Sequence, residues 1–244
     1  MMKMIQAKDY ADLSAKAANL LFARIVTKPD SVLGLATGSS VLGIYGKLIE
    51  SYQKGDLDFS RVKTFNLDEY VGLAEDDAQS YRYYMNENFF KHINIKRENA
   101  RLPDGAAADV AAECARYNAM IEESGGADIQ LLGIGLNGHI GFNEPKDHFV
   151  KETHVVALDE STIQANARFF ADAGQVPRRA ITMGVQNIML AKKIILCVSG
   201  KQKAAILKEA LRGPVTPKVP ASILQFHRNL TVVADADALG AARE

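Results

Sequence analysis

Three short polar segments carry the side chains best suited to chemistry. They are Thr37–Ser40, Asp68–Tyr70 and Asn137–Glu144, and each comes after an apolar run. Ligands of open parallel sheets bind outside the carboxyl ends of the strands. If the apolar runs form such a sheet, each segment is a candidate part of a ligand site.

The first segment, Thr37-Gly38-Ser39-Ser40, would join a strand to a helix. A glycine lets the backbone approach an anion, and the free N–H groups at a helix start attract one. Ser39 and Ser40 would add hydroxyl donors. An ordinary strand-to-helix turn with a serine N-cap explains the same residues, so both interpretations stay open.

Two adjacent acids, Asp68 and Glu69, stand where a strand is predicted to end. Partial burial in a cleft raises the proton affinity of a carboxylate toward neutrality, so that the group can act as a general base. A solvated acidic turn is the alternative, and the residues alone do not decide between the two.

The third segment lies in a glycine-rich stretch, in which residues 133–138 match the G-x-G-x-x-G pattern of dinucleotide-binding folds. That fingerprint must open a helix, and Gly141 and Pro145 make a helix improbable here. We therefore interpret the stretch as a loop. It presents four polar side chains, those of Asn137, His139, Asn143 and Glu144.

Within this loop, His139 and Glu144 are close enough for the carboxylate to orient and polarise the imidazole. Such a pair transfers protons near neutral pH. A structural histidine bonded to backbone is the alternative, but the glycines and amides around His139 favour a site. His148 is also nearby, yet no helical ligand pair or third strong ligand accompanies it, so no metal site is expected.

Composition narrows the class of protein. The 244 residues are 48% hydrophobic, and 29 Lys and Arg balance 29 Asp and Glu. These values predict one globular domain over residues 1–244 and argue against nucleic-acid or membrane-surface binding. Without a signal-like segment or a bilayer-length apolar run, a cytoplasmic protein is expected. Cys114 and Cys197 lie in apolar stretches and are expected to be buried, reduced thiols.

Short apolar runs alternate with amphipathic segments along the chain. Strands are predicted at 31–36, 62–67, 129–134, 153–158, 180–183, 194–198 and 230–234. Helices are predicted at 9–26, 40–55, 81–90, 110–122, 160–170, 185–191 and 201–211, the first with Asp9 as N-cap. This order predicts an α/β fold, a Rossmann-like, mostly parallel sheet with helices on both faces.

The chain resembles the glucosamine-6-phosphate deaminases in two signature stretches, Phe65-Asn-Leu-Asp-Glu-Tyr-Val-Gly-Leu73 and Leu136-Asn-Gly-His-Ile-Gly-Phe-Asn-Glu-Pro145. The resemblance covers almost the whole chain, including Ala167-Arg-Phe-Phe170 and Ser199-Gly-Lys-Gln-Lys203. The related 6-phosphogluconolactonases share the general fold and a Gly-His loop. Their pattern does not combine Asp-Glu-Tyr with Phe-Asn-Glu-Pro.

The resemblance implies a reaction without a cofactor, in which glucosamine 6-phosphate becomes fructose 6-phosphate and ammonia. Asp68 would be the base of the enolisation step. His139 would drive opening of the sugar ring, supported by Glu144 and Asn137. One carboxylate on one face of the open chain can serve both C2 and C1, and a neutral imidazole can move the ring-opening proton.

The resemblance also implies a phosphate site. Arg168 and Lys203 would bind the substrate phosphate beside Thr37–Ser40, with Gly38 and Ser39 at the helix start. In the family this arginine comes from a mobile lid, which here would span about Leu158 to Pro177.

Two departures from the family pattern matter. Many members have Asp where this chain has Asn137, so altered pH behaviour is expected. Larger members bind N-acetylglucosamine 6-phosphate as an activator through basic residues after Asn-Glu-Pro and a C-terminal extension. The corresponding stretch here is Lys146–Val155, and activation by that ligand is not expected.

Two other functions fit a similar fold, a sugar-phosphate lactone hydrolase and a non-catalytic sugar-phosphate sensing module. The Asp68-Glu-Tyr70 signature argues against the first. The second would need a DNA-binding partner domain, and the chain has neither a helix-turn-helix segment nor a basic excess. The oligomeric state is not predicted.

Overall fold

The main sheet of the molecule is parallel throughout. The computed structural model describes residues 2–167, 170 and 172–240. Within them, seven parallel strands follow the order β1-β10-β9-β6-β2-β3-β5. Their bounds are β1 Lys3–Ala7, β2 Val32–Leu35, β3 Lys63–Asn66, β5 Ala100–Arg101, β6 Ile129–Leu132, β9 Ile194–Val198 and β10 Leu230–Asp235.

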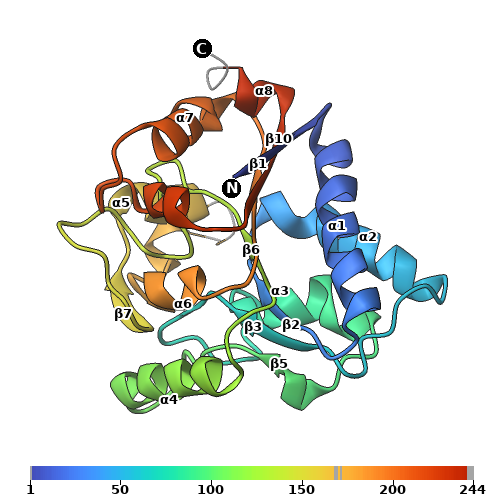
Figure 1. Cartoon of the computed structure of the whole chain (residues 1–244). Coiled ribbons are helices and arrows are strands. Elements are labelled where there is room, and N and C mark those ends of the chain that lie inside the picture. Colours follow the sequence, from blue (N-terminus) through green and yellow to red (C-terminus); the bar gives the residue numbers. More distant parts are fainter. Residues whose placement is uncertain (1, 168–169, 171, 241–244) are drawn as a thin grey trace.

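Helices cover both faces of this sheet, with α1 and α2 on one side and α4, α6 and α7 on the other (Figure 1). The α-helices are α1 Tyr10–Thr27, α2 Ser39–Gln53, α3 Tyr81–Asn88, α4 Val110–Glu123, α5 Glu160–Asn166, α6 Val185–Met189, α7 Ala204–Arg212 and α8 Ala236–Leu239. Short 3₁₀ helices are η1 Phe90–His92, η2 Arg97–Asn99, η4 Ala173–Gln175, η5 Lys201–Lys203 and η6 Pro220–Phe226. The predicted α/β fold is confirmed, and Asp9 caps α1 by accepting the Asp12 N–H.

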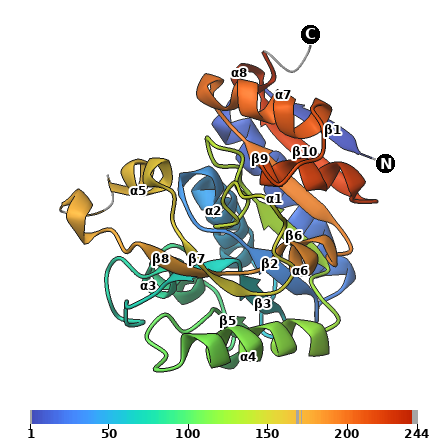
Figure 2. The same cartoon turned by 90° about the vertical axis from the view of Figure 1, so that its left-hand side faces the viewer.

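A second, antiparallel sheet lies beside the first. Its order is β4 (Asp68–Tyr70), β8 (Arg179–Thr182) and β7 (His154–Ala157). Figure 2 shows β7 and β8 beside the parallel sheet, with α5 next to them. The prediction that 153–158 and 180–183 join the mostly parallel sheet is therefore wrong. A short apolar run specifies a strand, whereas its partners depend on distant backbone.

Leu67 links the two sheets. Its N–H donates to Leu35 O at 3.1 Å, and its carbonyl accepts the Met183 N–H at 2.6 Å. The chain therefore passes from one sheet to the other between β3 and β4, where a single strand running into Asp68 was expected. Other differences are small: β1 and β5 were not predicted, and α5 ends at Asn166 rather than near 170.

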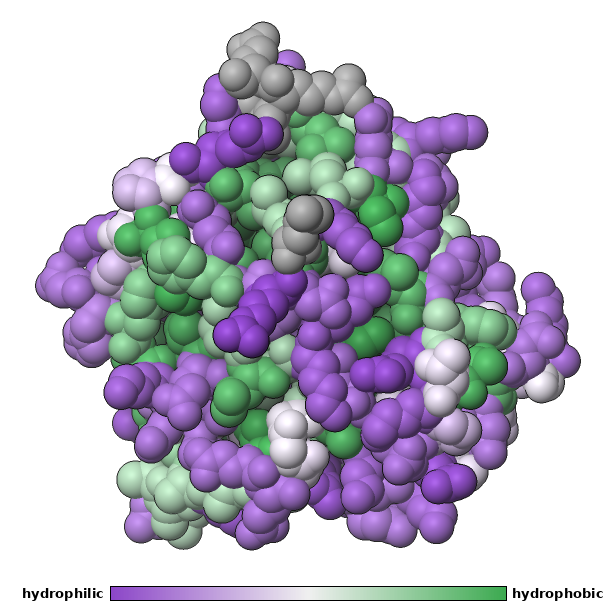
Figure 3. Space-filling model, viewed as in Figure 1, coloured by the Kyte–Doolittle hydropathy of each residue, from purple (hydrophilic) through white to green (hydrophobic). Residues whose placement is uncertain are grey.

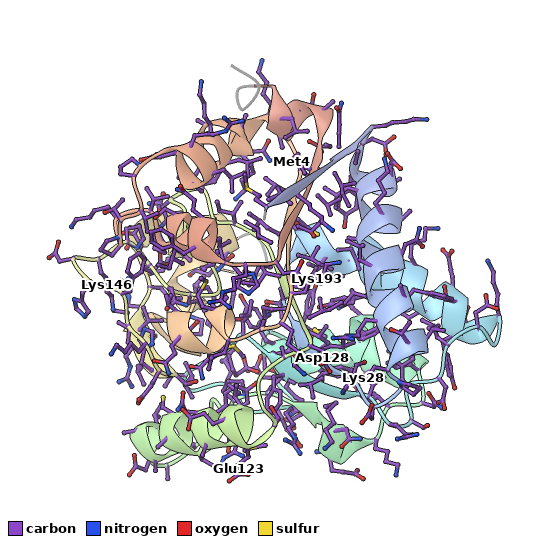
Figure 4. The ribbon with its side chains drawn as sticks, in the orientation of Figure 1. Met4, Lys28, Glu123, Asp128, Lys146 and Lys193 are labelled. Atoms are coloured by element: carbon purple, nitrogen blue, oxygen red, sulfur yellow. The ribbon has the colours of Figure 1, made fainter. Side chains whose placement is uncertain are left out.

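The amino ends of the strands are held together by Asp128, which precedes β6 and is buried. It accepts the Val32 N–H at 2.9 Å and pairs with Lys28 and Lys192, each at 2.9 Å. Figure 4 shows Lys28 beside Asp128. Burial favours the neutral acid, but these donors outweigh it and lower the pKa of Asp128 to about 2. The opposite, carboxyl ends carry the three polar segments.

The polar and apolar side chains are distributed as expected for a packed α/β protein. The face in Figure 3 is mainly hydrophilic, with smaller apolar patches between the polar side chains. Cys114 and Cys197 are buried free thiols, as predicted. In the part of the chain that the structure describes, no helix is long and apolar enough to cross a membrane.

Candidate active site

Four neighbouring strands, β9, β6, β2 and β3, bring the candidate segments to one edge of the sheet. After β2 the chain continues through α2 to β3 on one side, whereas after β6 it leads to β9 on the other. Such a reversal opens a crevice in which α/β folds bind ligands. Here the point of reversal lies between the turn at 37–40 and the loop at 133–144, and we refer to this region as the crevice.

Asp68 is 5% exposed, at the first position of β4. It lies against the loop, since a methyl group on Gly141 would be 3.4 Å from Asp68 Oδ2. Burial, assisted by the neighbouring Glu69 carboxylate, raises the pKa of Asp68 to about 8. The carboxyl group has no hydrogen-bond partner among the described residues, so it is available to exchange a proton with a ligand.

Glu69 has a different environment. Its carboxylate accepts the N–H groups of Tyr70, Tyr81 and Arg82 at 2.9, 2.8 and 2.9 Å. Two of these groups begin α3, so Glu69 caps that helix. Burial raises the pKa of Glu69 to about 7 although these three bonds favour the ionised form. The two adjacent acids therefore have different roles. Glu69 binds backbone N–H groups at the start of α3, whereas Asp68 faces the loop.

The loop brings Asn137, His139 and Glu144 into contact. Glu144 Oε2 accepts from Asn137 Nδ2 at 2.7 Å and lies 3.4 Å from His139 Nδ1. Asn137 Oδ1 accepts the His139 N–H at 3.2 Å. Burial alone would raise the pKa of Glu144, but the bonds from His139, Thr162 and Asn137 outweigh it and lower that pKa. A charged carboxylate therefore supports the imidazole.

Gly135 makes room for the histidine ring. A methyl group there would lie 2.3 Å from His139 Cε1, so any larger residue would displace the ring. No helix begins between Gly133 and Pro145, all of which are described, and the interpretation of this stretch as a loop is confirmed. Position 135 requires glycine because the His139 ring packs against it, and not because a dinucleotide binds there.

Sequence reasoning missed two residues that contact the pair. Thr162 Oγ1, in α5, lies 3.4 Å from His139 Nδ1, and the Asp159 N–H donates to Glu144 Oε1 at 3.4 Å. Both belong to the segment that was expected to form a lid. The only signal for them was that location, because neither residue type is distinctive.

The turn after β2 leads into α2 with Gly38 at the N-cap position and no side-chain cap bond. Gly38 adopts φ +96°, a conformation that favours glycine, and Ser39 begins α2. The Gly38 carbonyl accepts the Tyr84 hydroxyl at 2.9 Å, which fixes the turn. Across the crevice, a methyl group on Gly133 would lie 3.9 Å from Ser40 Oγ. With Thr37, these residues line the β2 side of the crevice.

Lys203 comes to the same region from the end of β9, which is separated from β2 by β6. It ends η5, after β9, and its Nζ donates to Ile134 O at 2.6 Å. The ammonium group is therefore held at the backbone of Ile134, the residue after Gly133, which lies against Ser40. Arg168, the other predicted phosphate ligand, lies outside the described residues.

An aromatic cluster packs the segment after β7 onto this site. The ring of Tyr70 lies within 5.8 Å of the rings of Tyr81, Phe142 and Phe170. Asn166 Nδ2, at the end of α5, donates to the Tyr70 hydroxyl at 3.0 Å. Tyr70 is two residues from Asp68, so α5 is connected to the strand that carries it.

Residues 7–233 match the family model described as glucosamine-6-phosphate isomerases/6-phosphogluconolactonase. The chain therefore belongs to this family of sugar-phosphate enzymes.

Within the family, the similarity is high to glucosamine-6-phosphate deaminases. The one from Lachnoclostridium phytofermentans is 60% identical over 232 residues, covering 95% of this chain and 98% of the relative. The one from Thermoanaerobacter sp. is 54% identical, covering 97% and 94%. These identities place the chain in the deaminase branch.

Solved structures extend the comparison. A structure described as a monomeric glucosamine-6-phosphate deaminase has a TM-score of 0.96 and 47% identity, covering 98% of this chain and all of the other. The 6-phosphogluconolactonase of Thermotoga maritima has a TM-score of 0.74 at 19% identity, covering 96% and 99%. The second similarity shows the shared fold alone.

Proposed function

We propose that this protein is an enzyme that converts glucosamine 6-phosphate and water into fructose 6-phosphate and ammonia, as the names of its relatives suggest. The observation that carries the proposal is the buried carboxyl group of Asp68, without a partner among the described residues and with a pKa raised to about 8, beside the loop of His139 and Glu144. Such a group exchanges protons with carbon at neutral pH.

In the first step, His139 opens the sugar ring. The imidazole takes the proton of the anomeric hydroxyl and returns a proton to the ring oxygen, so that the C1–O5 bond breaks and an aldehyde forms. The Glu144 carboxylate holds the ring of His139 and offsets its transient positive charge. Asn137 orients Glu144 through the bond at 2.7 Å.

In the second step, Asp68 takes the proton from C2 and an enolate forms, with its negative charge on O1. The same carboxyl group then returns this proton to C1, and a proton passes from the nitrogen at C2 to O1, so that C2 carries an imine. Water adds to C2, and the C2–N bond breaks with loss of ammonia. Because no electrons leave the substrate, the chemistry needs no redox cofactor.

The phosphate would bind at the far side of the crevice. The N–H groups at the start of α2 and the Lys203 ammonium, which is bonded to the Ile134 carbonyl, would supply the donors for it. Arg168 would complete this site from a lid over about 158–177. Holding both ends of the open chain sets C1 and C2 against Asp68, which contributes to rate through orientation.

We further propose that residues 1–244 act as one domain in the cytoplasm. A charged sugar phosphate is an intracellular metabolite, and two buried free thiols suit a reducing compartment. The similar solved deaminase is described as monomeric.

The test is release of ammonia and fructose 6-phosphate from glucosamine 6-phosphate, with 6-phosphogluconolactone assayed in parallel. Ammonia release that is lost in Asp68→Asn supports the proposal. Lactone hydrolysis without ammonia release would favour the hydrolase, and tight binding without turnover would favour a sensing module. Addition of N-acetylglucosamine 6-phosphate is expected to leave the rate unchanged.

A further inference from the structure

A groove of about 410 Å³ lies at the β5 edge of the parallel sheet, apart from the candidate active site. Four arginines line it, from α3, η2, β5 and α4; they are Arg82, Arg97, Arg101 and Arg116. Figure 2 shows β5 close to α4 at this end of the molecule. None of the lining residues belongs to the crevice described above.

Two of these arginines have no carboxylate partner within the described ranges. Arg82 is half-buried and donates from Nη1 to Ala100 O at 2.7 Å. The Arg101 guanidinium lies 5.2 Å from the centre of the Phe65 ring, and its Nε donates weakly to Glu98 O at 3.4 Å. Each guanidinium has five N–H donors, so most of their donors face the groove or solvent.

The charge of Arg82 is poorly compensated. Burial lowers the pKa of its guanidinium from the usual value, and the acids Glu75 and Glu69 only partly oppose this effect. A buried cation gains most from an anion that replaces the lost water. Burial of Arg82 therefore favours an anion in the groove, whose lining holds one acidic residue, Glu98, beside the four arginines.

The other two arginines carry ion pairs of different kinds. Arg97 pairs with Glu75 at 2.6 Å, but the two side chains are 83% and 60% exposed, so the pair exchanges readily with solvent and ligands. Arg116 forms two bonds with the buried Glu113, at 2.6 and 2.7 Å, which fix its position. The Arg97 side chain can therefore turn toward a ligand, whereas the Arg116 side chain keeps a fixed position at the side of the groove.

We propose that this groove is a second binding site, for a small phosphate-bearing anion. Guanidinium groups pair with phosphate oxygens through two parallel bonds, and several of them can share one tetrahedral group. The volume falls within the range of about 300–1,000 Å³ that is typical of small-molecule sites. The inference does not depend on the reaction that the crevice catalyses.

Calorimetric titration of the full chain with inorganic pyrophosphate tests the site. The titration is run on Lys203→Gln, which removes the phosphate contact proposed for the crevice. We expect binding that weakens at least tenfold when Arg101→Met is added, because Met keeps an apolar stem over Phe65 without the charge. Arg97→Met provides a second, exposed substitution, and Arg212→Met, on the exposed end of α7, is the matched control.

Absence of pyrophosphate binding in the Lys203→Gln protein would overturn the proposal. So would binding that survives both Arg101→Met and Arg97→Met in variants whose thermal melting is unchanged. Citrate is the comparison ligand: if citrate binds the groove more tightly than pyrophosphate, the assignment to phosphate is wrong.

Discussion

Asn137 Nδ2 donates to Glu144 Oε2 at 2.7 Å, and the same oxygen lies 3.4 Å from His139 Nδ1. The Asn137 amide therefore donates a hydrogen bond to the Glu144 carboxylate without adding charge to the site. Many relatives are expected to carry an acid in this position, which would put two carboxylates side by side. The identity of residue 137 thus sets the net charge around the histidine.

This arrangement predicts the effect of Asn137→Asp. The substitution removes a donor that helps to lower the pKa of Glu144 and adds a like charge, so that pKa rises. We expect the titration profile of the Glu144 carboxyl group, followed by NMR, to move to higher pH, by about one unit, with turnover retained. Asn137→Ala, which removes the donor without adding charge, should shift it less. Identical profiles for the three proteins would contradict this account.

Asp68→Asn should separate stability from activity. The folded pKa of Asp68, about 8, lies above its ordinary 3.8, so the folded state binds this proton more tightly. The contribution of this group to stability is therefore greatest at low pH and declines as pH rises from about 4 to 8. An amide resembles the neutral acid, and we expect Asp68→Asn to raise the free energy of unfolding at pH 7 by on the order of 2 kcal/mol.

Denaturant unfolding at pH 4 and pH 7 measures this difference, which should nearly vanish at pH 4. In the same variant, ammonia release should fall by at least about a hundredfold, the usual contribution of a general base. A variant that is less stable at pH 7 and no less active would show that Asp68 has been assigned wrongly.

The pH profile of kcat/KM for the wild-type protein should also report the ionisation of Asp68. Because Asp68 acts as a base only when ionised, kcat/KM is expected to rise with pH through about 8 in the free enzyme. Glu69 contributes to the raised pKa, so Glu69→Gln should move this limb to lower pH. Glu75→Gln, an exposed acid, serves as the control and should leave the limb in place.

Gly135→Ala tests the fit of the histidine. Its methyl group would lie 2.3 Å from the ring of His139, which must move and so lose its present position 3.4 Å from Glu144. We expect at least a tenfold loss of kcat/KM, since misplaced catalytic groups are costly. The control is Gly46→Ala in α2, where no atom lies within 4 Å and alanine should stabilise the helix by about 0.5–1 kcal/mol.

Tyr70→Phe tests the connection between α5 and β4. It removes the hydroxyl that accepts from Asn166 and keeps the ring in its aromatic cluster. We expect unfolding free energy to change by about 1 kcal/mol or less, KM to rise several-fold, and amide exchange in α5 to accelerate. Tyr83→Phe, at an exposed position, should alter none of the three.

Spacing along the chain was enough to predict local features. The strand 194–198 was predicted with the observed bounds, and Asp9 was recognised as the cap of α1. The cluster of Asn137, His139 and Glu144 spans only eight residues, so a tight loop brings it together. Such features depend on hydrophobic periodicity and on the bonds of neighbouring residues, which a sequence contains directly.

Only the tertiary structure decided which distant segments meet. Residues 153–158 and 180–183 read as buried strands, but their antiparallel pairing with β4 depends on the turn of the chain at Leu67. Likewise, Asp68 and Glu69 are neighbours of one chemical type, and their roles separate because one caps α3 while the other is buried against Gly141. Burial and hydrogen-bond partners come from long-range packing, and these set the proton affinity on which the proposed chemistry depends.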